Sequence, residues 1–434
     1  ELPDPVSKIV WHSWLEMNPD TAELRGIREG DIVTVTSPHG SLEVPVWLYP
    51  GIREDVVALA MGGGHTGMGR YADDKGVNAL RLLPSTSEQP SGALVTTVTS
   101  VTVIPTGENR RLATVEGSSG DQHDRLIAPA VALADLGHAG DDEHEEGGHE
   151  ELRELQGVGG FIPVPADEGA PTAFPLEGSR HGLYADAQEG PRWAMAIDLD
   201  KCTGCSACVT ACQAENNVPW VGEEQVLMGR DMNWVRIERF YEQVDATQAG
   251  DLDVRFLPMI CQHCGNAPCE TVCPVFATYH TPEGLNAQVY NRCVGTRYCA
   301  NNCPYKVRVF NWYRYTDEVP EPLNWQWNPD VTVRDNGVME KCSFCVQRIR
   351  EVQNRAALEG GREVRDHEVV PACEQSCPAE AIVFGNIRDP NARITQVSSS
   401  ERTYRVLEDL NTQPAVNYLK KVTFHEVASV GHEE

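Results

Sequence analysis

The chain of 434 residues contains no run of eighteen apolar residues. Because a helix needs about 20 apolar residues to cross a bilayer, we expect no membrane-spanning segment. The chain also lacks a Cys-x2-Cys-His motif, which excludes covalent attachment of a c-type haem to it. Basic residues are few, since 36 Lys and Arg stand against 64 Asp and Glu, a formal net charge of −28. This charge excludes nucleic acid as a partner, and any docking partner should be basic or apolar.

The N-terminal residue is Glu1, and no signal peptide or twin-arginine stretch is visible after it. We therefore expect a processed product, a fragment or the ordered part of a longer protein.

The fifteen cysteines all lie between residues 202 and 377. They form four groups, in chain order Cys202-x2-Cys205-x2-Cys208-x3-Cys212, Cys261-x2-Cys264-x4-Cys269-x3-Cys273, Cys293-x5-Cys299-x3-Cys303, and Cys342-x2-Cys345 with Cys373-x3-Cys377. In ferredoxins, closely spaced thiolates wrap one cubane, and the cysteine three residues later ligates the neighbouring cluster of a pair. Four groups of this kind predict four iron–sulfur clusters in two pairs.

Two other uses of cysteine fit less well. Tetrahedral zinc takes four ligands from two knuckles, which four cysteines within eleven residues suit poorly. Disulfide frameworks belong to short secreted scaffolds, whereas this chain is long and has an odd number of cysteines.

The third group has Thr296 where a central cysteine would stand. A threonine hydroxyl does not ionise near neutral pH and is a poor iron ligand. The substitution therefore predicts a [3Fe–4S] cluster in this group. Two alternatives remain, namely a labile fourth iron that carries water, and an ordinary cubane with another ligand.

The chain divides into four stretches. Residues 1–106 have the alternating pattern of a β domain at 31–36 and 42–47, with a further strand expected at 95–104.

Residues 107–192 form an acidic linker rich in Pro and Gly. Its histidines, His138, His144 and His149, suit a solvated linker better than a metal site.

Residues 193–390 hold the cysteine groups, with short strands expected at 235–240 and 381–384 and a helix at 340–358. Residues 391–434 are expected to form a wrapping tail that contains a helix within 403–419.

Two stretches resemble known families. Residues 202–378 resemble the four-cluster electron-transfer subunits of the molybdopterin oxidoreductase superfamily, such as those of polysulfide, dimethyl-sulfoxide and nitrate reductases. Residues 17–31, with Met17-Asn18-Pro19-Asp20 at their start and Gly30-Asp31 at their end, resemble the dinucleotide-binding domain of molybdopterin catalytic subunits. A fusion of both units in one chain is similar to the B subunit of bacterial alternative complex III. The resemblance covers roughly residues 6–105 and 193–425.

This resemblance implies an α+β fold, with an N-terminal double-psi β-barrel-like domain followed by a four-cluster ferredoxin-like domain with irregular loops. The barrel would be vestigial and hold no molybdenum. The glycines of 62–67 suit either a pyrophosphate cradle or, as we favour, a turn-rich loop.

The resemblance also implies which groups exchange ligands, since spacing alone does not. The four sets would be Cys202, Cys205, Cys208 and Cys377 for one [4Fe–4S] cluster, Cys342, Cys345, Cys373 and Cys212 for a second, Cys261, Cys264, Cys269 and Cys303 for a third, and Cys293, Cys299 and Cys273 for the [3Fe–4S] cluster.

The function implied by alternative complex III is electron transfer from quinol, by way of the [3Fe–4S] cluster, to a haem or copper partner. The expected partners are an integral-membrane quinol-binding subunit, multi-haem cytochrome c subunits, and a downstream periplasmic carrier or oxidase. The expected location is the periplasmic face of the bacterial cytoplasmic membrane. A rival function is electron transfer in a molybdopterin reductase of polysulfide, tetrathionate or dimethyl-sulfoxide type, and a third is a purely structural module.

Residues 304–315 directly follow the third cysteine group and are rich in aromatic residues, with three positive charges and no acid. Such a composition suits a surface at lipid-headgroup level or a dock on a membrane subunit. The alternative is that these aromatic residues pack inside the ferredoxin-like domain.

Overall fold

The computed structural model describes residues 3–69, 72–97, 99–117, 120–123, 125–136, 190–244, 252–317 and 319–425. The three linker histidines and the acidic run at 141–146 lie outside the described residues. The described residues fall into two compact units. The first lies within Glu1–Ser118, Trp220–Asp231 and Tyr241–Val254, and the second within Ser119–Pro219, Met232–Phe240 and Arg255–Glu434.

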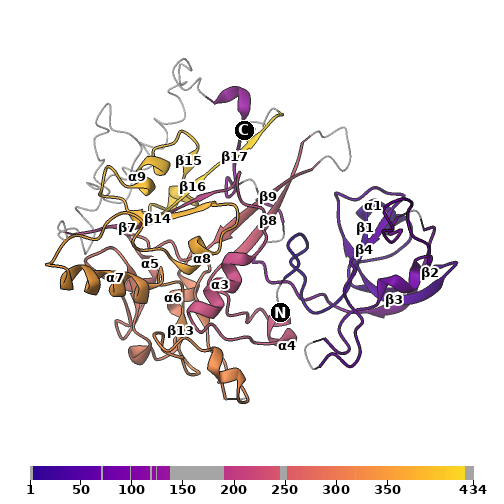
Figure 1. Cartoon of the computed structure of the whole chain (residues 1–434), viewed down its shortest axis with the longest axis horizontal. Coiled ribbons are helices and arrows are strands. Elements are labelled where there is room, and N and C mark those ends of the chain that lie inside the picture. The colour runs from indigo at the N-terminus through magenta and orange to yellow at the C-terminus, as the bar shows by residue number, and fades with distance from the viewer. Residues whose placement is uncertain are drawn as a thin grey trace. The chain divides into compact units, whose positions relative to one another are not determined.

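The first unit is built on a five-stranded mixed sheet in the order β4-β1-β3-β2-β5 (Figure 1). Its strands are β1 (Leu15–Met17), β2 (Asp31–Ser37), β3 (Gly40–Leu48), β4 (Val57–Leu59) and β5 (Thr102–Asn109). Strand β1 runs parallel to β3, and the other pairs are antiparallel. The strands predicted at 31–36 and 42–47 are confirmed, whereas the one predicted at 95–104 begins only at Thr102. The double-psi connection stays a prediction.

The core of this unit follows from alternation in its two long strands. Val33 and Val35 of β2 and Val44 and Val46 of β3 are almost fully buried, and they pack with Leu15 of β1. Side chains of a strand alternate between its two faces, so this period of two fills one face of the sheet with valine.

The Asn-Pro stretch of the first unit begins helix α1 (Pro19–Leu24). The side chain of Asn18 accepts the N–H of Asp20 at 2.9 Å and donates to the carbonyl of Ile52 at 2.8 Å. Asn18 is therefore both the helix cap and a tie between two segments. Gly30 has a φ of +80°, and a Cβ there would lie 2.8 Å from the carbonyl oxygen of Arg110, so only glycine fits.

The glycine loop at 62–64 is packed against its own unit. The N–H of Gly64 donates to the carbonyl of Lys75 at 2.8 Å, and a Cβ on Gly63 would lie 2.6 Å from Oγ of Ser13. These contacts explain the glycines by close packing, which supports the turn-rich loop over the pyrophosphate cradle.

The second unit contains a four-stranded sheet in the order β14-β7-β16-β15 (Figure 1). Its strands are β7 (Trp193–Asp198), β14 (Ile382–Asn386), β15 (Thr403–Tyr404) and β16 (Val416–Leu419). All six residues of β7 are buried, because α9 (Arg393–Ser398) also packs against β7 and β14. The helix predicted within 403–419 is limited to the 3-10 helix Glu408–Leu410, and Val416–Leu419 is instead β16, which joins the sheet in parallel beside β7. Its four residues are all buried, which favours a strand in the sheet centre over a surface helix.

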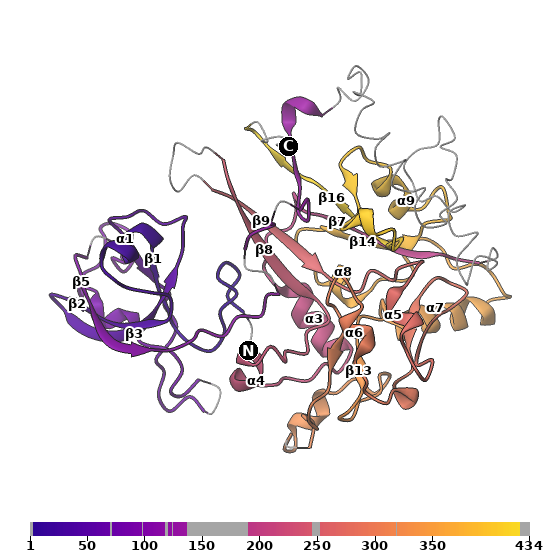
Figure 2. The ribbon, with the colours of Figure 1, turned by 180° about the vertical axis from the view of Figure 1, so that it is seen from behind.

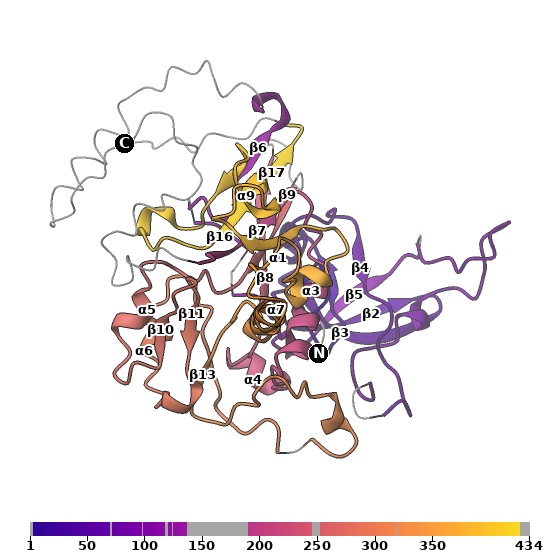
Figure 3. The same ribbon diagram turned by 60° about the vertical axis from the view of Figure 1, so that its left-hand side comes forward.

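Apart from α9, the α-helices described in the second unit lie next to cysteines, and most of them are short. They are α3 (Ala207–Glu215), α5 (Pro268–Thr271), α6 (Tyr298–Asn301), α7 (Val346–Leu358) and α8 (Ala372–Gln375). Helix α3 packs against α8 (Figure 2), and α5 packs against α6 beside the β10–β11 hairpin (Figure 3). The predicted helix at 340–358 begins only at Val346, because the chain from 342 to 345 turns through positive φ at Phe344 and Cys345.

The other strands form two-stranded pairs, and the other α-helix is short. They are β8 (Arg236–Gln243) with β9 (Leu252–Met259), β10 (Thr278–His280) with β11 (Asn286–Gln288), β12 (Val309–Phe310) with β13 (Met339–Glu340), β6 (Ala130–Ala132) with β17 (Lys421–Thr423), and α4 (Glu223–Leu227). Within the described ranges, every helix is too short or too polar to cross a bilayer.

Candidate iron–sulfur centres

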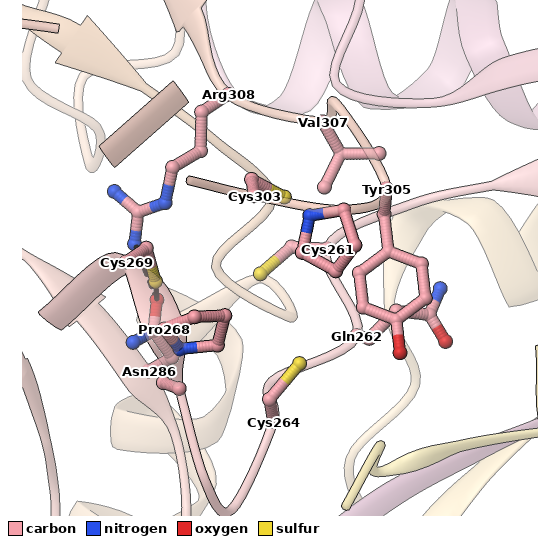
Figure 4. Close-up of a pocket in the computed structure, with 12 residues that line it drawn as sticks. Cys261, Gln262, Cys264, Pro268, Cys269, Asn286, Cys303, Tyr305, Val307 and Arg308 are labelled. Atoms are coloured by element: carbon pink, nitrogen blue, oxygen red, sulfur yellow. Dashed lines mark hydrogen bonds between the residues drawn. The ribbon is translucent and has the colours of Figure 1, made fainter. Parts of the chain in front are cut away.

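The predicted cysteine sets gather around separate spaces in the second unit. Three of these spaces are lined by Cys202, Cys205, Cys208 and Cys377, by Cys261, Cys264, Cys269 and Cys303 (Figure 4), and by Cys273, Cys293 and Cys299 with Thr296. In each space a closely spaced group is joined by one cysteine from another group.

The remaining four cysteines also lie together. Burial, and after it the charges of Cys342 and Cys345, raises the pKa of Cys212 well above its ordinary value. Burial and the thiols of Cys345, Cys342 and Cys212 do the same to the pKa of Cys373. Nδ2 of Asn216 donates to Sγ of Cys212 at 3.5 Å and to Sγ of Cys345 at 3.8 Å, and the N–H of Ala372, next to Cys373, donates to Sγ of Cys345 at 3.5 Å. Cysteines of the first and fourth groups therefore meet here.

Helix packing explains why distant groups share a space. Helix α3 carries Cys208 and Cys212, and it packs against α8, which carries Cys373. Helix α5 carries Cys269 and packs against α6, which carries Cys299. The second unit thus contains two halves. In each half, one pair of packed helices supplies cysteines to two neighbouring sites.

The four ligand loops share one backbone feature. The residue in front of the second ligand position has a positive φ in each loop: Gly204 at 67°, His263 at 43°, Gly295 at 72° and Phe344 at 54°. A left-handed residue in a tight loop turns successive backbone amides toward one point, which suits an anionic cluster.

The loop with Thr296 closely matches the first loop. One residue after the second ligand position, φ is 62° at both Ser206 and Arg297. Thr296 therefore occupies the place that Cys205 holds in the first loop, and it lines its space in the same way.

Backbone N–H groups donate to several of the cysteine sulfurs. The donor and acceptor pairs are Ala277 to Cys273 at 3.1 Å, Ala381 to Cys377 at 3.3 Å, Phe344 to Cys342 at 3.4 Å, Met339 to Cys293 at 3.4 Å, and Ala372 to Cys345 at 3.5 Å. Hydrogen bonds to sulfur stabilise the anionic form of a ligand and tune cluster potential.

The donor sets fit iron–sulfur clusters. Burial, followed by neighbouring thiols, raises the pKa of Cys208 and of Cys342 to about 12. Thiolates are the form that binds metal, and iron cations supply the positive charge that would keep these buried sulfurs ionised. All fifteen cysteines are free of disulfide bonds. Across the described ranges, no three His, Cys, Asp or Glu side chains are placed to hold a single metal ion.

The segment 304–315 is divided between the interior and the surface. Tyr305 is buried, and its hydroxyl lies 2.7 Å from Oγ1 of Thr412. Arg308 is buried beside Cys269, so the prediction that the whole segment forms a docking surface is wrong. The hydrogen-bonding needs of a guanidinium are met here by interior groups. Trp312 and Tyr313 are 36% and 53% exposed, and they remain candidates for a dock.

No pattern in the sequence indicated the buried ion pair that lies in the second unit. Arg334 and Glu340 are both about 1% exposed and lie 2.8 Å apart. Nε1 of Trp234 donates to the same carboxylate at 3.0 Å, and Nδ2 of Asn311 donates at 2.7 Å. These residues come from three separate segments, so spacing along the chain gave no signal for them.

Comparisons with known protein families support the conclusion that this chain binds iron–sulfur clusters. The model described as molydopterin dinucleotide binding domain matches residues 5–98. Two models described as 4Fe-4S dicluster domain match residues 201–277 and 252–318.

Curated relatives make the class more specific. The iron–sulfur cluster-binding subunit of menaquinone reductase from Nitratidesulfovibrio vulgaris is 42% identical over 53% of this chain and 89% of that protein. The Hdr-like menaquinol oxidoreductase iron–sulfur subunit 1 from Archaeoglobus fulgidus is 34% identical over 54% of this chain and 86% of that protein. The B subunit of tetrathionate reductase from Salmonella typhimurium is 32% identical over 58% of this chain and 79% of that protein. The chain therefore belongs to the family of iron–sulfur electron-transfer subunits of quinol-linked and molybdopterin-type reductase complexes.

Proposed function

We propose that this chain carries electrons through three [4Fe–4S] clusters and one [3Fe–4S] cluster in a membrane-associated, quinol-linked complex. The observation that carries the proposal is the gathering of the cysteines into four sets, each built from two groups. Iron–sulfur clusters supply one-electron transfer at potentials that hydrogen bonds and burial adjust. The protein's part is to hold thiolates, exclude water and aim N–H groups at sulfur.

The kind of complex has two candidates. Relatives named as subunits of menaquinone, tetrathionate and putative dimethyl-sulfoxide reductases favour a reductase of molybdopterin type. The presence of a dinucleotide-binding domain and dicluster domains in one chain supports alternative complex III as the second candidate. Metal analysis of the purified complex separates them. Stoichiometric molybdenum favours the reductase, and abundant c-type haem on partner chains favours alternative complex III.

We place the membrane dock on an apolar surface around the three-cysteine site. Val294 and Tyr298 are 62% and 60% exposed and belong to its ligand loop. The guanidinium of Arg297 in the same loop lies 4.5 Å from the ring of Trp312. Aromatic and apolar side chains beside a guanidinium suit an interface at headgroup level or with a membrane subunit.

Introducing acids into this surface is expected to weaken docking. Val294→Glu with Tyr298→Glu should release the chain from washed membranes, or slow quinol reduction of its clusters by at least tenfold, because both additions put charge into an apolar contact. Leu358→Glu is the matched control, since Leu358 is 89% exposed at the end of α7. Membrane retention and reduction rate that equal those of the control would exclude this surface as the dock.

We also propose a location on the periplasmic face of the cytoplasmic membrane. Clusters are inserted before export, so the chain would cross the membrane folded, alone or with a partner. Protease added to intact spheroplasts is expected to degrade the chain while a cytoplasmic marker survives. Protection of the chain until the cells are lysed would place it on the cytoplasmic side.

A further inference from the structure

Arg308 lies in the interior of the second unit and directly contacts a cluster cysteine. Arg308 is 6% exposed, and its Nη2 lies 3.2 Å from Sγ of Cys269 (Figure 4). The guanidinium is fixed by Oγ1 of Thr278 and Oδ1 of Asn286, each at 2.6 Å, and by Oε1 of Gln288 at 2.8 Å. These bonds hold a permanent positive charge at the wall of the space shown in Figure 4.

The charge of Arg308 has no carboxylate bonded to it among the described residues. Its hydrogen-bond partners are a hydroxyl, two amide oxygens and the thiols of Cys269 and Cys299. The buried carboxylate of Glu270 is bound instead to His280, at 2.6 Å, and to Asn286. A buried guanidinium needs a negative partner to offset its loss of water. The cysteine sulfurs are the groups whose negative charge interacts with it, Cys269 first.

The other half of the unit provides an internal comparison. Segments 303–310 and 377–384 both begin with a cysteine and a proline, have positive φ at the fourth residue (52° and 49°), and end in Val-Phe. The sixth residue lines the space in both halves, but it is Arg308 in one and Ile382 in the other. The arginine is therefore not a requirement of the loop fold.

We propose that Arg308 sets the potential of the cluster held by Cys261, Cys264, Cys269 and Cys303, and makes it the more easily reduced of the two equivalent clusters. This inference rests on the proposed function. Reduction adds one electron to an anionic site, and a fixed positive charge at hydrogen-bond distance stabilises the added charge. Arginine does not lose its proton in proteins, so its effect does not depend on pH near neutrality. Arg308 also donates a hydrogen bond to Cys299, so the potential of the neighbouring three-cysteine site should shift in the same direction.

The test is a redox titration of the full chain with its clusters, followed by low-temperature EPR. Iron and acid-labile sulfide are measured first in the wild type and in each variant. Arg308→Gln is expected to lower the equilibrium constant for reduction of one [4Fe–4S] cluster at least tenfold, which is about 59 mV for one electron. Arg308→Lys should lower it by less, because the ammonium group keeps the charge but not the planar fork. Arg355→Gln is the control, since this arginine is 52% exposed and paired with Glu351.

The outcomes separate the two proposals. If Arg308→Gln holds all four clusters at unchanged potentials, the role of Arg308 is overturned, but the proposed function is not. If that variant loses iron, Arg308→Met replaces it as the neutral variant, and wild-type potentials in a fully loaded methionine variant overturn the proposal. Equal shifts in Arg308→Gln and Arg355→Gln overturn it too, because they would reflect net charge only. A wild-type chain without iron overturns the proposed function and this inference with it.

Discussion

Replacing Thr296 by cysteine is expected to add a fourth iron to the three-cysteine site. The wild-type chain should hold about fifteen iron atoms, and its oxidised state should give a paramagnetic signal near g of about 2, because three coupled ferric ions leave an odd-electron spin. In Thr296→Cys the iron content should rise by about one atom per chain, and most of this signal should disappear.

The structure gives a direct reason for this expectation. Thr296 lines the same space as Cys273, Cys293 and Cys299. The loop around it has the φ values of the loop around Cys205, at both neighbouring positions. A thiolate at position 296 would therefore reach its cluster without any change in the backbone, whereas the threonine hydroxyl stays neutral and binds iron poorly.

Thr296→Ser is the matched control for this experiment. Serine keeps a hydroxyl at the same place, so the signal and the iron content should stay those of the wild type. A wild-type protein that lacks the oxidised-state signal and contains iron for four cubanes would contradict the assignment, and would favour another ligand at the fourth iron.

Removing iron is expected to unfold the second unit and to leave the first unit folded. Helices α5, α6 and α8 have four residues each, far fewer than the roughly 12–15 that an isolated helix needs. Their positions depend on thiolates from different groups meeting at one cluster. The free energy of metal binding contributes directly to folding in such a unit. The free energy lost with the iron should exceed the free energy of unfolding of an ordinary domain, which is about 5–15 kcal/mol.

The first unit has no cysteine and has a core of its own around β1, β2 and β3. An iron chelator under reducing conditions should therefore abolish one calorimetric transition and preserve another. The same chelator saturated with iron beforehand is the control. Iron-free protein that keeps both transitions at wild-type temperatures would show that the second unit folds without clusters.

Most of the candidate site could be predicted from the cysteine groups. A ligand loop must be short, so its residues are adjacent in sequence and visible as a motif. The exchange of cysteines between groups came from the family resemblance, and helix packing of α3 with α8 and of α5 with α6 supplies its physical basis.

Long-range burial was harder to predict. Arg308 was expected at the surface because arginine usually is, but it lies inside, where Thr278, Asn286 and Gln288 from the β10–β11 hairpin bind it. No local pattern marks such partners 20–30 residues away. A helix was expected within 403–419, but residues 416–419 form a strand through their parallel pairing with β7.

Quinol reduction of the purified complex tests the central claim most directly. The complex that contains this chain is oxidised, mixed with a soluble menaquinol analogue under argon, and followed by low-temperature EPR. The account predicts about fifteen iron atoms per chain and loss of the oxidised signal near g of about 2 within the turnover time of the complex. A signal that dithionite removes but quinol leaves unchanged, or a chain without iron, would contradict it.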